Sequence, residues 1–541
     1  MKVYQTIART LSENGVDVMF GLMGDANMFM VDSYIRDCKG RFVPAANEAG
    51  GIAMALGYAL ASGKPGICSV THGPAMTNTL TGLIEGVKGQ VPAVLICGDT
   101  PVLDRENLQD VAQREFAIAT GAGFEQVRAP ATAGADVVRA LARATRERRP
   151  IVLNVPVAFD WEEVGDFQPT RVYIPERRSL VSEGRDIDNA IGIIAAARRP
   201  LIIAGRGAST SEAKASLIRL ADRIGAPLAT TLKGKDLFEG EAFNLGICGT
   251  MSGAGATETI MESDCLIAFG ASLNKYTTAH GGNVRGKRII QVNLEAEEVG
   301  KNVPIEAGLV GDPAQVADLI VHWLEEAEIP SSQWRGQEIL DRIKGDRTEP
   351  PGRFDNGDGT VDFLSVLTRL DAVLPKDRIL VSDSGRFMIE AFKRLHVSEP
   401  QSLIVTHNFG SIGLGVPHAI GACFGSDGRP VVALCGDGGF MNGGLAEFNT
   451  AVRTGAQLIV IVFNDGVYGA EHYKFKLKQL DWNNIGYDWP DFAKVAIALG
   501  GDGITLASEN DWDMVAGALA RRSKPLLIDI KIDREKVPCE F

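Results

Sequence analysis

The chain has 541 residues, 45% of them hydrophobic and 61 of them glycine, so it exceeds the size of one core and predicts about three α/β domains. Its formal net charge of -13 argues against nonspecific binding to nucleic acids or anionic membranes, because both polyanions would repel it. The first residues lack the apolar stretch of a signal peptide and no run reaches membrane-spanning length, which predicts a cytoplasmic protein. The eight cysteines form no C-x-x-C pair and are expected to be buried thiols.

The chain alternates expected helices with short apolar runs, which is the pattern of doubly wound parallel sheets. Three such units are predicted, over residues 1–165, 180–340 and 355–541. Charged, turn-rich segments at 161–179 and 344–360 are expected to link them. The expected strands are VDVMFGL, RFVPAAN, GICSVTH, AVLICGD and PIVLNVP in the first unit; PLIIAGRG, APLATTL, CLIAFGA and RIIQVNL in the second; and ILVSDSG, VVALCGD, QLIVIVFN and PLLIDIKI in the third.

The third unit contains the most informative stretch, which runs from residue 431 to residue 469. Two apolar strands are expected here, one ending at Asp437 and the next at Asn464 and Asp465. Because both strands run the same way through one crossover, their polar ends should meet at one edge of the sheet. Carboxylate and amide oxygens there would suit Mg²⁺ or Ca²⁺.

Three glycines surround the first of these aspartates: Gly436, Gly438 and Gly439. They would let a ligand approach the backbone closely, and the amides of the following helix would offer an anion site. A cation beside an anion cradle indicates a diphosphate. Taken alone, however, Asp-Gly is a common turn pair, and the motif could be no more than a turn.

The spacing of GDG and an Asn-rich strand end resembles the thiamine diphosphate motif of the pyruvate decarboxylase, acetolactate synthase and benzoylformate decarboxylase superfamily. The segments RFVPAANEAGGIAMALGYALASGKPG, FGLMGDAN and HNFGSIGLG also resemble that superfamily, so the likeness covers essentially the whole chain. It implies pyrimidine-binding, central and diphosphate-binding domains in that order, with thiamine diphosphate and Mg²⁺ (or Ca²⁺) as cofactors.

The resemblance assigns the catalytic glutamate to Glu48, which would exchange a proton with ring N1' of the cofactor aminopyrimidine. Glu48 precedes an apolar helix in surroundings poor in other charges, where desolvation would favour a shared proton. A glutamate favoured by the dipole of a helix start is the alternative.

The resemblance also assigns the residues that would bend the cofactor. Ile412 matches the apolar wedge beneath it, and the Gly410 carbonyl matches the acceptor of the 4'-amino group.

The second metal ligand is open between two neighbouring residues. The family has Asn-Asn where this chain has Asn464-Asp465. Alignment on Tyr468 makes Asp465 the ligand, together with the Val467 carbonyl, whereas counting from Asp437 selects Asn464 and the carbonyl two residues later. The first alignment is favoured.

Six residues are candidates for facing the substrate. They are Asp25, His72, Gln109 and Glu471, with His407 and His472 as additional histidines. Asp25 and Glu471 match acid–base residues of pyruvate-type decarboxylases, and Gln109 resembles a glutamine of acetolactate synthases. Simpler interpretations are a helix cap for the aspartate, a solvated helix residue for the glutamate and structural hydrogen bonds for the histidines.

Together these features predict non-oxidative decarboxylation of a 2-oxo acid, with or without carboligation of the enamine to a second carbonyl. An acetolactate synthase-like carboligase and a noncatalytic regulatory homologue are the alternatives. A nicotinamide dehydrogenase would need G-x-G-x-x-G after the first strand, and FGLMGDAN lacks it. The resemblance further implies a homo-oligomer, a dimer of dimers, whose cofactor lies between two chains.

Overall fold

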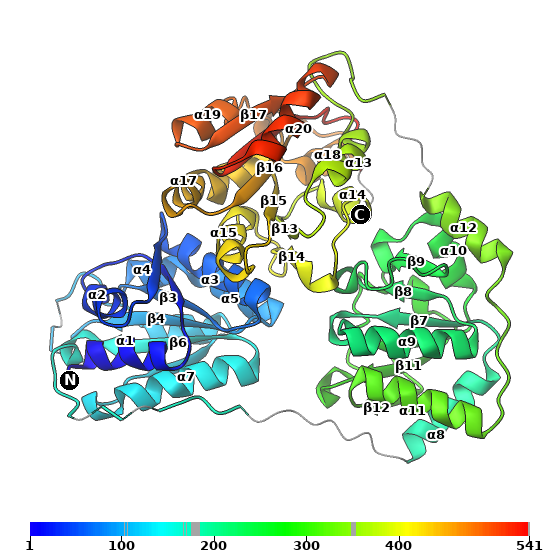
Figure 1. Cartoon of the computed structure of the whole chain (residues 1–541), viewed down its shortest axis with the longest axis horizontal. Coiled ribbons are helices and arrows are strands. Elements are labelled where there is room, and N and C mark those ends of the chain that lie inside the picture. The colour runs from blue at the N-terminus through cyan, green and yellow to red at the C-terminus, as the bar shows by residue number, and fades with distance from the viewer. Residues whose placement is uncertain are drawn as a thin grey trace. The chain divides into compact units, whose positions relative to one another are not determined.

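The computed structural model describes residues 1–538 except 102, 105, 166, 169, 175–183 and 348–352. Parts of both expected linkers, and Cys539, therefore lie outside the described residues. The chain forms three six-stranded sheets, and the described pairings between their strands are parallel. The expectation of three doubly wound α/β domains is confirmed (Figure 1).

The first sheet has the strand order β2-β1-β3-β4-β6-β5. From β1 the chain continues to β2 on one side and later to β3 on the other, so the strand order reverses between β1 and β3. Ligands of doubly wound folds bind at such a reversal point, outside the carboxyl ends of the strands. The strands are β1 (Val18–Gly21), β2 (Arg41–Pro44), β3 (Gly66–Val70), β4 (Ala93–Asp99), β5 (Gly123–Gln126) and β6 (Pro150–Pro156). The helices are α1 (Val3–Glu13), α2 (Met28–Arg36), α3 (Glu48–Ser62), α4 (Pro74–Asn78), α5 (Leu80–Gly89), α6 (Gln113–Ala119) and α7 (Ala133–Glu147).

The second sheet, with order β12-β11-β10-β7-β8-β9, belongs to a compact unit of its own, formed by Glu176–Gly352 with Ile389–Leu403. Its strands are β7 (Pro200–Ala204), β8 (Leu228–Thr230), β9 (Asn244–Ile247), β10 (Cys265–Phe269), β11 (Arg288–Asn293) and β12 (Ala307–Val310). Its helices are α8 (Arg185–Ala196), α9 (Ser211–Ile224), α10 (Ala254–Glu262), α11 (Pro313–Glu326) and α12 (Gln337–Arg347), with α14 (Met388–Arg394) at the later segment.

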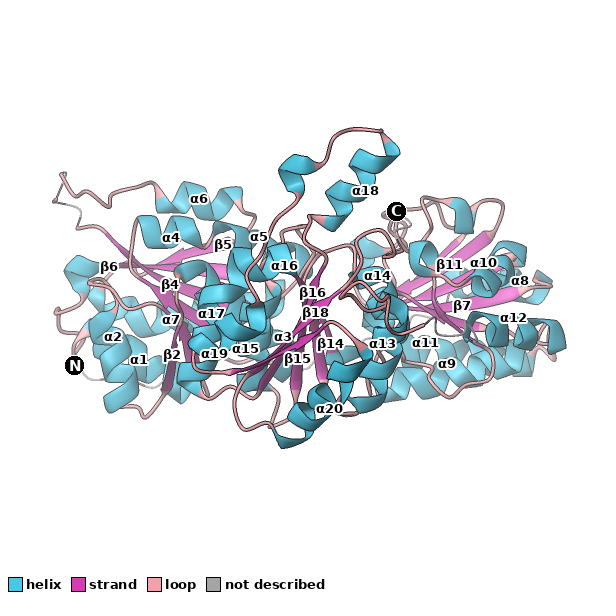
Figure 2. Ribbon diagram, turned by 90° about the horizontal axis from the view of Figure 1, so that it is seen from above, coloured by secondary structure: helices cyan, strands magenta, loops and turns pink. Residues whose placement is uncertain are grey.

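The third sheet has the order β14-β13-β15-β16-β18-β17 and reverses direction between β13 and β15. Helices cover both of its faces (Figure 2). Its strands are β13 (Ile379–Ser382), β14 (Leu403–Val405), β15 (Val431–Gly436), β16 (Leu458–Asn464), β17 (Asp502–Leu506) and β18 (Leu526–Lys531). Its helices are α13 (Phe363–Val373), α15 (Gly415–Gly425), α16 (Asp437–Gly439), α17 (Leu445–Thr454), α18 (Gly469–Leu477), α19 (Phe492–Ala498) and α20 (Trp512–Arg521), and a π-helical segment (Phe440–Gly444) joins α16 to α17.

The first and third sheets belong to the same compact unit, in which α3 packs against α15. Most residues of both helices are buried, which matches their largely apolar composition. The backbones touch: a Cβ at Gly57 would lie 1.9 Å from the His418 carbonyl oxygen, and one at Gly421 would lie 1.8 Å from that of Met54. Glycine at both positions therefore sets the distance between the two helices.

Five strands of the three sheets were not predicted from the sequence: β5, β9, β12, β14 and β17. Each of them lies at the edge of its sheet. Seven cysteines fall within the described residues, all are free thiols, and five of these are buried. Across the described part of the chain, no helix combines the length and the apolar character needed to cross a membrane.

Candidate active site

The predicted meeting of two polar strand ends is found at the carboxyl edge of β15 and β16. These strands are parallel neighbours, with Gly436 opposite Phe463. The backbone N–H of Gly466 donates to Asp437 Oδ2 at 2.7 Å, which joins the two loops directly. Gly466 takes a φ of +68° in this turn, a conformation that favours glycine.

The two carboxylates at this edge are buried and electrostatically coupled. Burial and the negative charge of Asp465 raise the pKa of Asp437 to about 7. Burial also raises the pKa of Asp465, whereas Arg386, whose Nη2 donates to Asp465 Oδ2 at 2.7 Å, acts in the opposite direction. Two buried carboxylates in mutual repulsion are the donor set that a hard divalent cation would stabilise, so the residues present fit Mg²⁺ or Ca²⁺.

The other candidate for second ligand has its side chain engaged elsewhere. Asn464 Nδ2 donates to Asp529 Oδ1 at 3.0 Å, and both residues are buried between β16 and β18. By contrast, Asp465 Oδ1 accepts from the backbone of Val467, the residue whose carbonyl was assigned to the metal. This geometry supports Asp465 as the ligand and gives Asn464 a structural bond.

Two of the three glycines around Asp437 are required by protein packing as well as by any ligand. A Cβ at Gly438 would lie 2.3 Å from the Tyr468 ring, and one at Gly439 would lie 2.6 Å from Asp383 Oδ2. Gly436 has no such neighbour, since only the Phe387 ring comes within 4 Å, at 3.8 Å. The motif thus packs on the loop after β16 and on the strand end of β13.

The loop between β14 and α15 carries the expected wedge and carbonyl. Gly410 has a φ of +84° and Ile412 is half-buried. The Ile412 carbonyl accepts from Asn442 Nδ2 of the π-helical segment at 3.2 Å. Burial raises the pKa of Asp383 to about 7, even though backbone N–H groups of this loop, that of Gly413 foremost, donate to it.

Glu48 is the first residue of α3, whose N-cap is Asn47. It is half-buried, and its Oε2 accepts from Asn78 Nδ2 at 2.9 Å. A residue that no sequence motif marks is Glu447, a fully buried residue of α17 whose carboxylate accepts from the backbone N–H groups of Ala46 and Asn47. Burial raises the pKa of Glu447, and its hydrogen bonds tie the third domain to the segment before Glu48.

Asp25 and His72 lie together at the reversal point of the first sheet. Thr71 Oγ1 donates to Asp25 Oδ1 at 2.7 Å and lies 3.4 Å from Nδ1 of the buried His72. The N-cap of α2 is Asn27, so Asp25 does not cap that helix. Asp25 remains exposed, which leaves its carboxylate accessible to a ligand.

Gln109 lies close to this pair, because a Cβ at Gly73 would be 2.3 Å from the Gln109 carbonyl oxygen. Gly73 has a φ of +60°, and its N–H donates to Gln113 Oε1 at 2.9 Å. Gln113 is buried and also donates to the Gly98 carbonyl and to Asn154. No sequence motif singles it out, because a glutamine at the start of a short helix carries no distinctive signal.

The remaining candidates lie in α18 and before α15. Glu471 is exposed in the first turn of α18, as a solvated helix residue would be. His472 is buried, with Nε2 3.3 Å from Glu535 Oε1, and burial lowers its pKa. His407 is half-buried beside Asn408.

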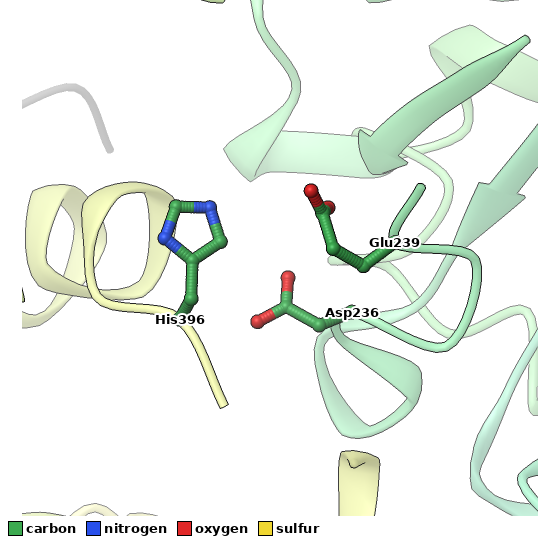
Figure 3. Close-up of side chains that lie close together, drawn as sticks. All are labelled: Asp236, Glu239 and His396. Carbon is green, nitrogen blue, oxygen red and sulfur yellow. The ribbon is translucent and has the colours of Figure 1, made fainter. Parts of the chain in front are cut away.

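A separate group of potential ligands occurs in the second unit, where Asp236, Glu239 and His396 face one another (Figure 3). Their ligand atoms all lie within 4.8 Å of one another. Asp236 Oδ2 is already 2.6 Å from Lys235 Nζ and accepts from the Val397 N–H. These contacts tie the loop between β8 and β9 to the segment after α14, and the group shares no residue with the predicted metal site.

Sequence comparison agrees with the fold and this geometry. Three family models match in the expected order: the thiamine pyrophosphate enzyme N-terminal TPP binding domain over residues 1–120, the central domain over 187–320 and the C-terminal TPP binding domain over 383–530. The chain therefore belongs to the thiamine pyrophosphate enzymes, in the superfamily of acetolactate synthase and pyruvate decarboxylase.

Curated relatives cover nearly the whole chain. An acetolactate synthase of Mycobacterium bovis is 28% identical over 97% of this chain and 87% of its own length. A probable acetolactate synthase large subunit of Methanocaldococcus jannaschii is 26% identical over 98% and 92%. A sulfoacetaldehyde acetyltransferase of Alcaligenes xylosoxydans xylosoxydans is 26% identical over 93% and 87%. The protein is thus an enzyme of the thiamine-dependent decarboxylase and carboligase class.

Proposed function

We propose that this chain catalyses the thiamine diphosphate- and Mg²⁺-dependent, non-oxidative decarboxylation of a 2-oxo acid. The observation that carries the proposal is the pair of carboxylates Asp437 and Asp465 at the carboxyl edge of β15 and β16, where the Gly466 N–H donates to Asp437 and so joins the two loops. Arg386 pairs with Asp465 but leaves Asp437 without a cationic partner in this pair, so a divalent cation would stabilise both carboxylates and would in turn hold a diphosphate. When bound, the thiazolium supplies an electron sink for the loss of CO₂.

Separate residues of the chain would bind the metal, exchange the proton and fix the conformation of the cofactor. Asp437, Asp465 and the Val467 carbonyl would hold Mg²⁺. Glu48 would hold or release the proton at ring N1', while Ile412 and the Gly410 carbonyl would fix the bent cofactor conformation. The protein contributes orientation, desolvation and proton placement rather than the bond-breaking chemistry itself.

The substrate would bind beside Asp25 and His72. Their shared partner Thr71 holds both at the reversal point of the first sheet, close to Gln109. Asp25 is an exposed carboxylate in this group and would return a proton to the product. Glu471, exposed on α18, is the second candidate for that role.

Carboligation is the second candidate function. It is favoured by the acetolactate synthase relatives and by Gln109, whose loop packs against Gly73 beside His72. In this case the fragment left after CO₂ loss would be transferred to a second carbonyl compound rather than protonated. The name of the acetyltransferase relative shows that acyl transfer also occurs among these proteins.

One experiment separates these functions. The purified chain is analysed for bound thiamine diphosphate and incubated with pyruvate and with branched, aromatic and acidic 2-oxo acids, with CO₂ and products measured. Aldehyde as the sole organic product supports decarboxylation, and a hydroxyketone or a 2-hydroxy-3-oxo acid supports carboligation. Cofactor binding without CO₂ from any acid would contradict both and support a regulatory homologue.

We further propose a homo-oligomer, a dimer of dimers, in which the first domain of one chain and the third domain of another enclose the cofactor. The support is that Glu48 and Asp437 each lie at a sheet edge of a different domain. Neither edge alone would exclude water from the cofactor.

A further inference from the structure

The loop that joins β14 to α15 is held at both ends by buried carboxylates that lie outside the loop. Glu85, on α5, is 2% exposed and Asp383, after β13, is 1% exposed. Their contacts flank the tip of the loop, residues 410–412, which contains the proposed wedge Ile412.

The first anchor receives three hydrogen bonds from two consecutive loop residues. Glu85 Oε1 accepts from the Asn408 backbone N–H at 3.1 Å and from Asn408 Nδ2 at 2.6 Å. Glu85 Oε2 accepts from the Phe409 N–H at 2.7 Å. Because both oxygens of one buried carboxylate accept from two consecutive residues, Glu85 fixes the start of the loop tip.

The second anchor fixes the other end. Asp383 Oδ2 accepts from the Gly413 N–H at 2.8 Å, and its Oδ1 accepts from the Ser384 N–H at 2.8 Å. Gly413 has a φ of +87° and a Cβ there would lie 3.0 Å from the Gly443 nitrogen, so the backbone is fixed sterically as well. Only three residues separate the anchored positions 409 and 413.

We propose that Glu85 and Asp383 are positioning residues that hold residues 410–412 in the cofactor-binding conformation before the cofactor arrives. Glu85 belongs to the first domain whereas the loop belongs to the third, so α5 controls the shape of a cofactor loop in another domain. The inference rests on the proposed function for the role of Ile412, but not for the existence of the anchors. Preorganised groups bind a ligand more tightly because the entropy of ordering is not lost on binding.

The test uses Glu85→Gln in the full chain, since the amide keeps the size but can accept from only one side. Hydrogen–deuterium exchange is measured on the cofactor-free protein, and affinity for thiamine diphosphate is titrated at saturating Mg²⁺. We expect at least fivefold faster exchange confined to residues 408–413, and about tenfold weaker cofactor binding. Glu85→Asp keeps both acceptor oxygens, so its exchange rate and cofactor affinity should lie between those of the parent and of Glu85→Gln.

Glu390→Gln serves as the matched control, because Glu390 is also a buried glutamate but pairs with Lys393 and Arg394 in the other unit. It should leave exchange at 408–413 and cofactor affinity unchanged. Should Glu85→Gln not fold, Asp383→Asn tests the same proposal at the other end, with faster exchange expected at 413–415.

Unchanged exchange at 408–413 in Glu85→Gln would overturn the proposal, and so would cofactor affinity equal to that of the parent. The proposed function fails separately: if the parent chain binds thiamine diphosphate but releases no CO₂ from any 2-oxo acid, the anchors are still tested by exchange and affinity.

Discussion

Gly466 donates its backbone N–H to the Asp437 carboxylate, so the turn after β16 is fixed by the residue that follows β15. The two residues are neighbours only because the strands are parallel and in register at Gly436 and Phe463. A metal-binding loop and its carboxylate are thereby assembled by the sheet itself, before any cation is bound.

Asp437→Ala should abolish binding of thiamine diphosphate, because the diphosphate would lose its metal bridge and the Gly466 N–H its acceptor. Calorimetric titration of the cofactor in the presence of Mg²⁺ measures the effect. Thiamine diphosphate affinity equal to that of the parent would remove the central claim about this site.

Asp465→Ala should weaken Mg²⁺ binding more than Asn464→Ala does. The reason is that Asn464 donates to Asp529, so its removal should instead lower the stability of the fold by about 1–3 kcal/mol through an incompletely paired buried carboxylate. Metal titration and denaturant unfolding of both variants separate these effects. The reverse order of Mg²⁺ affinities would select Asn464 as the ligand.

Glu48→Gln should keep thiamine diphosphate and Mg²⁺ bound but reduce turnover by roughly a hundredfold or more, because the amide cannot exchange a proton with ring N1'. The steady-state rate of CO₂ release and the bound cofactor content are measured on the same preparation. A rate within about twofold of the parent is incompatible with the assigned role.

Mixing Glu48→Gln chains with Asp437→Ala chains should restore part of the activity after subunit exchange. Each variant inactivates a different half of the intersubunit site, so some mixed sites would contain two intact halves. Exchange is followed with differently tagged chains, and each variant mixed with itself is the control. Demonstrated exchange without recovered activity, or an active species that sediments as a monomer, would place the cofactor within one chain.

Asp160→Asn should change how stability depends on pH. Burial raises the pKa of Asp160 to about 7 in the folded chain, whereas an unfolded aspartate titrates near 3.9. The unfolded chain therefore loses this proton first, and parent stability contributed by the site falls as pH rises from about 4 to 7 and is constant above that. The asparagine variant lacks this loss, so its advantage should grow over the same interval to on the order of 2 kcal/mol.

Thermal unfolding at pH 5 and pH 8 checks this prediction. The variant should gain a few °C relative to the parent at pH 8 and less at pH 5. An advantage that shrinks towards pH 8 has the wrong sign and would show that Asp160 is ionised and stabilised in the folded chain.

The sequence predicted the interior strands of every sheet and missed most of the edges for one physical reason. A central strand such as β16 is buried along its whole length, so it is a continuous apolar run. Edge strands are short and partly exposed: β5 ends in Glu125 and Gln126, and β17 begins at Asp502. Their pairing depends on the neighbouring strand rather than on their own composition.

Some residues of the site could likewise be predicted from the sequence and others could not. Asp437 and Asp465 could be predicted to lie together because strand topology places them, and Glu48 could be assigned by resemblance. Asp383 follows a buried strand as Asp437 does, so the same reasoning applied to ILVSDSG could have found it. Glu85 offered only a single acidic residue within an apolar helix, LTGLIEG, and its partners are more than 300 positions away in the sequence.

The contact between α3 and α15 also has a consequence for synthesis on the ribosome. The two helices are largely apolar, yet about 350 residues separate the end of α3 from the start of α15. At 5–20 residues per second, α3 waits roughly 20–70 s for the surface that covers it. A nascent chain of this protein therefore exposes the apolar face of α3 that packs on α15 for most of its translation. Fragments that stop before residue 415 should need a chaperone to stay in solution.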